Sequence, residues 1–331
     1  MNSAANGKVK LTGFEYLKKY SVILTALILI VFATIASGGL YFRSSNMINV
    51  GERAAAIGII ALGQMLVILT GGMDLSVGGI TSVGFCVTAM LLQYTSLHPF
   101  LVILLMLLAT TACGAVNGII VAKSKIPPFM LTLGTQMFFT SLALVLSKSQ
   151  NLQFGKQVTW MVEAWHLDGL AGRLFPTALW IAASVIIILV LAYTRFGKNI
   201  YQTGGTELAA RMSGIKTDHV KFMVYALSGF FCGLAALTVE FRLQFCNASS
   251  TSDYMISSVA AVIVGGTSLK GGEGNVYGTF VGAFIMASLD NIMNLCNLDV
   301  YSQDSVKGIV LLVFVVISCM LTNSSGKKVT Q

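Results

Sequence analysis

The sequence predicts an all-α polytopic membrane protein with about ten transmembrane helices and with both termini in the cytoplasm. Of the 331 residues, 55% are hydrophobic and only 10% are charged, and the mean hydropathy is +0.80. A soluble domain would carry about 25% charged residues, whereas this chain repeatedly runs about 20 residues without a charge, which is the length of a transmembrane helix. The 33 glycines agree with this class, because glycine lets membrane helices pack closely.

Apolar runs between polar breaks give the expected crossings in chain order. They cover residues 21–40, 54–70, 77–95, 99–122, 128–147, 177–194, 220–241, 255–267, 276–295 and 304–322. The segment before the first run is too polar for a cleavable signal peptide, and the run itself is long enough to span. We therefore expect the first helix to remain as an anchor.

Basic residues lie mostly on one side of the predicted crossings. With the N-terminus inside, all but seven of the 21 basic residues are cytoplasmic, the exceptions being Arg43, Arg53, Lys148, Lys156, Arg173, Arg242 and Lys307. Because cytoplasmic loops carry an excess of Lys and Arg, this bias favours an even number of crossings with both termini inside. Topology explains the net charge of +8, so no nucleic-acid partner is expected.

These boundaries divide the chain into three parts. We expect a cytoplasmic tail at 1–20, a single transmembrane domain at 21–322 with a cytoplasmic segment at 195–219, and a second cytoplasmic tail at 323–331. The longest external loop is then 149–175, where Trp160, Trp165 and Phe175 favour an interfacial anchor or, as the alternative, a contact with a partner.

The cytoplasmic segment is a polar island between two long apolar runs. Thr206 is expected to cap the first turn of a helix, Glu207 suits the positive end of its dipole, and Gly214 can end it in the left-handed conformation. The result is a helix of about two turns. It carries a small apolar knob with flanking residues, namely Leu208 and Met212 with Ala209, Ala210 and Arg211. We expect another protein to grip this surface.

A second constellation, GGMDLSVG, lies between the second and third apolar runs. Gly71 and Gly72 are expected to end one helix, and Asp74 or Ser76 to cap the next. An acidic group beside broken helices is also typical of substrate contacts in transporters. Two roles remain open for Asp74. It is either a helix cap in a plain tight turn or a contact with the substrate.

A third glycine-rich segment, Val264–Gly274, reads VGGTSLKGGEG. It loosely echoes the stretch VILTGGMDLSVGG around Gly71. The echo is weak evidence for an internal structural repeat, because a glycine-rich membrane protein contains such pairs by chance.

Polar residues within the predicted spans are few, and such groups normally face the interior of a helix bundle. They are Asn117, Gln136, Glu240, Asp290, Asn291 and Asn294. The last three are expected on one helical face near the outer end of the ninth run. They either hydrogen-bond hydroxyl groups of a transported molecule or tie helices together.

Cysteine and histidine give no sign of a cofactor, a metal or a catalytic site. The six cysteines lie mostly inside apolar runs without metal-like spacing, and the three histidines are scattered. A disulfide between Cys246 and Cys296, both expected outside, remains open. No phosphate-binding loop, nucleophile elbow or zinc motif occurs in the sequence.

Taken together, four segments resemble the sugar-type permeases of ABC importers, the ribose, xylose, arabinose, galactose and autoinducer transporters related to branched-chain amino-acid permeases. The segments are GGMDLSVG, KIPPFMLTLGTQMF, RFGKNIYQTGGTELAARMSGIKT and VAAVIVGGTSLKGGEGNVYGTFVGAFIMASLDN. They keep the family's order and spacing over nearly the whole chain. The resemblance implies a multi-pass permease subunit of the bacterial inner membrane that imports a monosaccharide and performs no chemistry itself.

The resemblance also implies partners. Two permease subunits, identical or paralogous, form the path, a tandem ABC ATPase drives it from the cytoplasm, and a soluble binding protein delivers sugar outside. In that family the short helix enters a groove of the ATPase. The coupling residues are then Gly197, Gly204, Gly205, Thr206, Glu207, Leu208, Ala209, Ala210, Arg211, Met212 and Gly214.

Two positions depart from the family pattern. Thr206 replaces the usual asparagine, which is a change between two helix caps. Family members commonly carry an acidic pair in a pattern such as YELDAIAA, where this chain has Met255 and Ser257. An outer-gate or docking contact made by those carboxylates is therefore in doubt. The run GAFIMASLDN is most similar to xylose-type members and favours a monosaccharide.

The main alternative is an ion-coupled secondary transporter, in which Asp74 and Asp290 would carry protons or sodium with the substrate. A passive channel is a third interpretation. Sparse charge near the membrane midplane counts against both. The sequence names neither the sugar nor the type of the second permease subunit.

Overall fold

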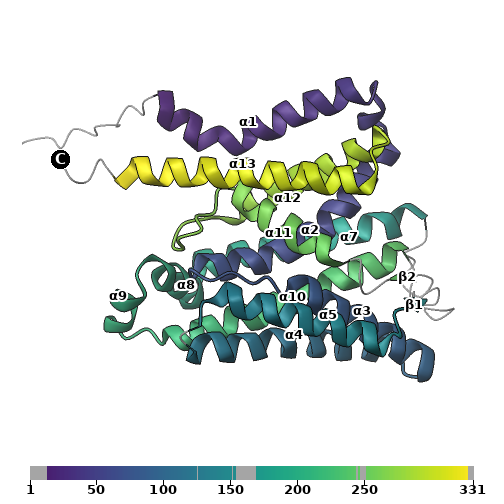
Figure 1. Ribbon diagram of the computed structural model, residues 1–331, viewed down its shortest axis with the longest axis horizontal. Helices are drawn as coiled ribbons and strands as arrows, with labels where there is room; N and C mark the ends of the chain where they lie inside the picture. The colour runs from purple at the N-terminus through teal and green to yellow at the C-terminus, as the bar shows by residue number, and fades with distance from the viewer. Residues whose placement is uncertain are drawn as a thin grey trace, which may run out of the picture.

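The computed structural model describes residues 13–124, 126–150, 152–153, 169–243, 245–246 and 251–326, and Figure 1 shows them as a bundle of long helices. The elements are α1 (Gly13–Ala36), η1 (Leu40–Phe42), α2 (Ser44–Leu69), α3 (Val77–Tyr94), α4 (Pro99–Lys123), α5 (Pro128–Leu146), α7 (Gly169–Tyr193), α8 (Arg195–Gly205), α9 (Glu207–Met212), α10 (Thr217–Leu243), α11 (Ser252–Val264), α12 (Val276–Leu295) and α13 (Val300–Gly326). The strands β1 (Leu152–Gln153) and β2 (Phe245–Cys246) pair antiparallel. Apart from this pair of strands, the described residues confirm the predicted all-helical architecture.

All ten predicted apolar runs coincide with helices. Seven of the described helices, α2, α3, α4, α5, α7, α10 and α12, are long and apolar enough to cross a membrane. The predicted run 255–267 falls on α11, which has 13 residues and so extends only about 20 Å, less than the roughly 30 Å of hydrocarbon in a bilayer. The count of ten crossings stays a prediction.

The polar island folds into two helices, where the sequence analysis expected one. Besides α9, the segment contains α8, whose first turn is capped by Thr194: its hydroxyl accepts the amide hydrogen of Gly197 over 3.1 Å. In Figure 1, α8 and α9 lie at one end of the bundle, and the first residues of α1 and the last residues of α13 lie at the same end. Trp160, Trp165 and parts of both predicted tails lie outside the described residues.

Helix α2 forms the centre of the bundle. Its side chains from Ala54 to Leu69 are buried almost without exception, and it packs against α7, α10, α11 and α12. Beside it, the rings of Trp180 on α7 and Phe280 on α12 stack with centroids 3.9 Å apart. Helices α4, α5 and α7 instead carry many exposed apolar side chains, among them Leu104, Met137 and Ile186, which suits contact with lipid.

Helices α4 and α10 cross closely. Each helix has two glycines four residues apart at the crossing, Gly114 and Gly118 on α4, and Gly229 and Gly233 on α10. A Cβ atom on Gly114 would lie 2.3 Å from the carbonyl oxygen of Tyr225. Paired small residues of this kind let membrane helices meet backbone to backbone.

We predict that Gly229→Ala destabilises the fold, because the new Cβ would lie 2.3 Å from the carbonyl oxygen of Thr110 and overpacking costs about 1–3 kcal/mol. The matched control is Gly134→Ala on α5, where no atom lies within 4 Å of the new Cβ. Thermal unfolding in detergent should show a lower midpoint for Gly229→Ala alone. Equal midpoints would contradict the close crossing.

Candidate functional site

Three glycine-rich segments meet at the end of the bundle that carries α9. The amide of Gly272 donates to the carbonyl oxygen of Leu69 over 2.9 Å. A Cβ atom on Gly204 would lie 1.7 Å from that same oxygen, and one on Gly271 would lie 2.8 Å from the amide nitrogen of Gly71. We call Leu69, Gly71, Gly204, Gly271 and Gly272 the glycine junction. It joins the end of α2, the end of α8 and the loop between α11 and α12 through backbone atoms alone.

The predicted end of α2 is confirmed. The helix stops at Leu69, and the amides of Gly71 and Gly72 turn back to the carbonyl oxygens of Ile68 and Val67. Gly71 has a φ of 78°, a left-handed conformation that glycine adopts without a steric penalty.

Helix α9 begins and ends where the sequence predicts. Thr206 occupies the N-cap position, but the predicted side-chain cap is wrong: its hydroxyl accepts from no amide of α9 and instead donates to the carbonyl oxygen of Gly205 over 2.7 Å. Gly214 ends the turn with a φ of 82°, as expected. Ala210 packs inward, while Leu208 and Met212 are 70% and 83% exposed. The apolar knob thus points away from the bundle.

A network of charges ties α9 to the start of α10. Glu207 accepts from Lys221 over 2.7 Å, from Arg211 over 3.0 Å and from the hydroxyl of Thr217 over 3.2 Å. Arg211 also pairs with Asp218. Partial burial would raise the pKa of the Glu207 carboxyl, but the hydrogen bonds from Lys221 and Arg211 outweigh it and hold this pKa below its ordinary value.

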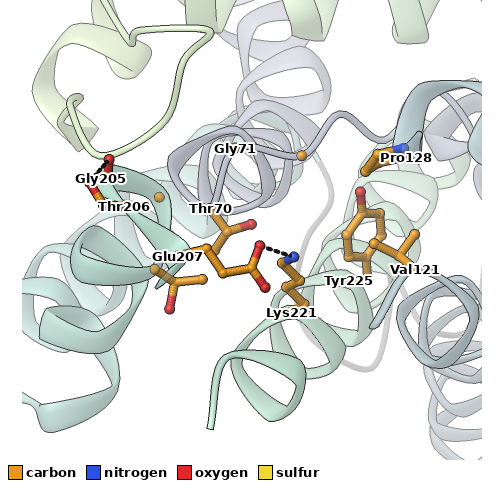
Figure 2. A pocket seen from close by; sticks show the side chains of 12 residues that line it. Thr70, Gly71, Val121, Pro128, Gly205, Thr206, Glu207, Lys221 and Tyr225 are labelled. Carbon is orange, nitrogen blue, oxygen red and sulfur yellow. Dashed lines mark hydrogen bonds and ion pairs between the residues drawn. The ribbon is translucent and has the colours of Figure 1, made fainter. Parts of the chain in front are cut away.

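A cavity of about 350 Å³ lies between this network and the glycine junction. We call it the junction cavity. Figure 2 shows the ion pair of Glu207 and Lys221 at its edge, with Thr70 on one side and Tyr225 on the other. Thr203 also lines it. The walls therefore come from both α9 and the helices of the bundle.

Asp74 lies deeper in the protein and is completely buried. Its carboxylate accepts from the amide of Ser76 over 3.0 Å and from the hydroxyl of Ser228 over 2.8 Å, and Asn117 donates to the Ser76 hydroxyl over 2.7 Å. Ser76 is the N-cap residue of α3, although its side chain makes no capping hydrogen bond. This closed set of hydrogen bonds matches the structural alternative for Asp74, which lines neither the junction cavity nor the cavity described next.

A second cavity, of about 290 Å³, lies at the other end of α12, and we call it the distal cavity. Asn291 and Asn294 line it and Asp290 does not. The amides of Asn291 and Asn46 bond to each other over 2.9 and 3.0 Å, so the two interpretations left open, contact with a transported molecule and a tie between helices, both stay predictions. Asp290 pairs instead with Lys307 of α13 over 3.1 Å. The remaining lining residues are Asn46, Asn49, Arg53, Arg242 and Leu295.

The sequence analysis missed the charged residues around the distal cavity. Glu52, nearly buried, pairs with Arg173 over 3.0 Å and with Arg242 over 3.5 Å. Glu52 and Arg53 stand directly before the second apolar run. This pair of charges at the end of a predicted membrane helix was the signal in the sequence that could have identified them. The partners of Glu52 lie more than a hundred residues away along the chain, so spacing gave no indication of them.

The positions of the missing acidic pair lie on α11. Met255 packs against the core and Ser257 is buried. Asp253, two residues before Met255, pairs with Lys307 over 2.7 Å, so a carboxylate is still present at the start of this helix. Cys296 is a free cysteine in this structure, and the side chain of Cys246 lies outside what the structure describes. Among the described residues, no group of three His, Cys, Asp or Glu side chains is placed to hold a metal.

Comparison with known proteins gives consistent matches. A family described as "Branched-chain amino acid transport system / permease component" matches residues 46–317. The chain is 34% identical to the ribose import permease protein RbsC of Bacillus subtilis, with 91% of this chain and 92% of the relative covered. It is 32% identical to RbsC of Escherichia coli K12, over 91% and 94% of the two chains. Identity to the xylose transport system permease protein XylH of Escherichia coli K12 is 30%, over 92% and 93%.

No solved structure matches the chain at a significant level. The family match covers α2 to α12 and most of α13. It includes the glycine junction, α9 and both cavities. The chain is thus a member of the branched-chain amino-acid and ribose-type permease family of membrane transport systems.

Proposed function

We propose that this protein is the permease subunit of an ABC importer that moves a monosaccharide across the bacterial inner membrane. ATP hydrolysis takes place on a separate tandem ATPase. The observation that carries the proposal is α9: an exposed apolar pair, Leu208 and Met212, on a short helix that ion pairs and backbone contacts hold against the bundle. The relatives named as ribose and xylose permeases support a pentose as cargo.

Orientation follows from charge and from the arrangement of the helices. The bias of Lys and Arg toward one side favours a cytoplasmic position for α9, where ATP is available. In Figure 1 the start of α1 and the end of α13 lie at the same end of the bundle as α9. This arrangement supports the prediction that both termini are cytoplasmic. An extracytoplasmic sugar-binding protein would then meet the opposite end, where the distal cavity lies.

The mechanism is alternating access without chemistry in this chain. Closure of the ATPase subunits on ATP moves α9, which the ATPase grips through Leu208 and Met212. The Glu207 network passes this motion to α10, and the glycine junction passes it to α2 and to the loop between α11 and α12. Packed helices respond to such small shifts by moving as rigid bodies. ATP can drive this change only because the ATPase binds ATP with different affinities in the two states of the importer.

Substrate contacts are proposed at the distal cavity, at Asn291 and Asn294. Both residues line this cavity together with Asn46, Asn49 and two arginines, and a sugar would replace the hydrogen bonds that the amides of Asn291 and Asn46 make to each other. The hydrogen bonds of Asp74 and Ser76 and the ion pair of Asp290 favour structural roles for these three, and Gly71 and Gly72 act in the turn after α2. A second permease subunit, identical or paralogous, completes the path.

We predict that the double variant Leu208→Ser, Met212→Ser folds normally but no longer retains the ATPase, because both side chains are exposed and contribute little to the core. Co-purification from detergent should show loss of the ATPase by at least about tenfold. The matched control is Tyr301→Ser, an exposed side chain in the first turn of α13, and α13 begins at the other end of the bundle (Figure 1). Equal retention of the ATPase by both variants would contradict the contact.

We predict that Glu207→Gln separates ATP hydrolysis from uptake. The amide keeps the shape of the side chain but leaves Lys221 and Arg211 without their shared carboxylate, so α9 moves without pulling α10. In proteoliposomes, sugar carried per ATP hydrolysed should fall by roughly tenfold, while ATP hydrolysis continues. An unchanged ratio would remove this network from the mechanism.

The energy source of uptake tests the proposed function as a whole. We predict that uptake of labelled ribose or xylose into proteoliposomes requires the permease, the ATPase, the binding protein and ATP together, and that a protonophore leaves it unchanged. Uptake that follows an ion gradient without ATP would instead support the ion-coupled alternative, for which nothing in the ion pairs of Asp290 or the hydrogen bonds of Asp74 provides evidence.

A further inference from the structure

The side chains around the distal cavity offer hydrogen-bond donors, while their acceptors are already in use. The polar walls are four asparagines and two arginines, namely Asn46, Asn49, Asn291, Asn294, Arg53 and Arg242. Each asparagine side-chain oxygen accepts a hydrogen bond, from Asn291, Arg173, Asn46 and Gln303 in that order. An arginine side chain carries donors alone. The walls that the structure describes therefore suit a ligand group that only accepts hydrogen bonds.

The donors that remain unused on these walls are accessible. Arg53 is partly exposed and makes no hydrogen bond or ion pair with another described residue. Asn49 is exposed, and within the described part of the chain its amide nitrogen donates to nothing. The Arg242 side chain is 27% exposed, and its Nε lies 3.5 Å from the carboxylate of Glu52. These three side chains can therefore donate to a ligand in the cavity without first giving up a hydrogen bond of their own.

Positive charge exceeds negative charge on these walls. Glu52 is the counter-ion of two arginines at once, Arg173 over 3.0 Å and Arg242 over 3.5 Å, and it does not itself line the cavity. Asp290 lies outside the lining too, and its carboxylate pairs with a lysine of α13 over 3.1 Å. The guanidinium of Arg53 is thus left without a carboxylate partner among the described residues. A carboxylate on a ligand would supply this partner through charge-assisted hydrogen bonds, which are stronger than those between neutral groups.

We propose that the importer prefers an acidic monosaccharide over a neutral one, because the distal cavity pairs the sugar's carboxylate with Arg53 and Arg242. The inference rests on the proposed function and names the class of sugar. The planar guanidinium group matches a carboxylate with two parallel hydrogen bonds. A volume of about 290 Å³ suits one small molecule, so the hydroxyls of the same sugar can reach Asn291 and Asn294. A pentonate such as D-ribonate combines this carboxylate with the five carbons of the pentose proposed above.

The test is a calorimetric titration of the purified full-length permease with D-ribonate and with D-ribose, without the binding protein. Wild type should bind D-ribonate at least about tenfold more tightly than D-ribose. Arg53→Gln should remove this preference by weakening the binding of D-ribonate alone. Since Arg53 bonds to no other described residue, this variant is expected to fold. The matched control is Arg43→Gln, which removes an exposed arginine directly before α2 that does not line the cavity and should keep the preference.

The outcomes separate this inference from the proposed function. Equal affinities for the two compounds, no binding of D-ribonate, or a preference that survives Arg53→Gln would overturn the sugar-acid site, while ATP-driven uptake of ribose or xylose would still support the importer. If Arg53→Gln weakens only the complex with the binding protein, the arginines hold a side chain of that protein, and the sugar-acid site is overturned. A preference that Arg53→Gln removes, in a protein without ATP-driven uptake in complete proteoliposomes, would keep the site but overturn the proposed function, and with it the sugar acid as cargo.

Discussion

The backbone contact between the end of α2 and the loop before α12 sets the positions of α8, α9 and the junction cavity at one end of the bundle. Gly272 donates to Leu69, and Gly204 lies against the same carbonyl group with no room for a Cβ atom. Backbone atoms in direct contact cannot slide past one another as flexible side chains can, because protein interiors are closely packed. Helix α8, and α9 after it, are therefore fixed to the most deeply buried helix of the protein.

Ion pairs and hydrogen bonds attach α9 to α10 as well. Glu207 joins three donors from Arg211, Thr217 and Lys221, so α9 is held to α10 at several points, while its apolar side chains face outward. In the proposed mechanism, movement of α9 reaches α10 through these ion pairs and α2 through the glycine junction. At the other end of the bundle, Asp290, Lys307 and Asp253 connect α12, α13 and α11. The distal cavity thus sits among helices that are connected to α9 by continuous contacts.

Local patterns predicted the elements well. Apolar runs located ten helices, and Gly71 and Gly214 marked helix ends, because their left-handed conformations have a clear residue signature. The sequence did not predict long-range partners. Nothing in the spacing brings Gly204 to Leu69, Asn46 to Asn291, or Arg173 to Glu52, since helix packing decides these pairs. The side-chain cap predicted for Thr206 is absent for a local reason: its hydroxyl is turned to the carbonyl oxygen of the neighbouring Gly205 and accepts no amide hydrogen of α9. Helix α8 was missed because the search for long apolar runs passes over a helix that is polar on average, although Gly197, Ile200 and Thr203 recur at helical spacing and form its buried face.

The contact between α9 and an ATPase is the central claim, and site-specific cross-linking tests it most directly. A single cysteine at Met212→Cys, in a chain whose native cysteines are replaced by serine or alanine, should cross-link to the ATPase in the active importer, since this side chain is largely exposed. The yield should change between ATP-bound and nucleotide-free states. An active importer in which this cysteine never cross-links to the ATPase, while a cysteine at Tyr301→Cys does, would contradict the account.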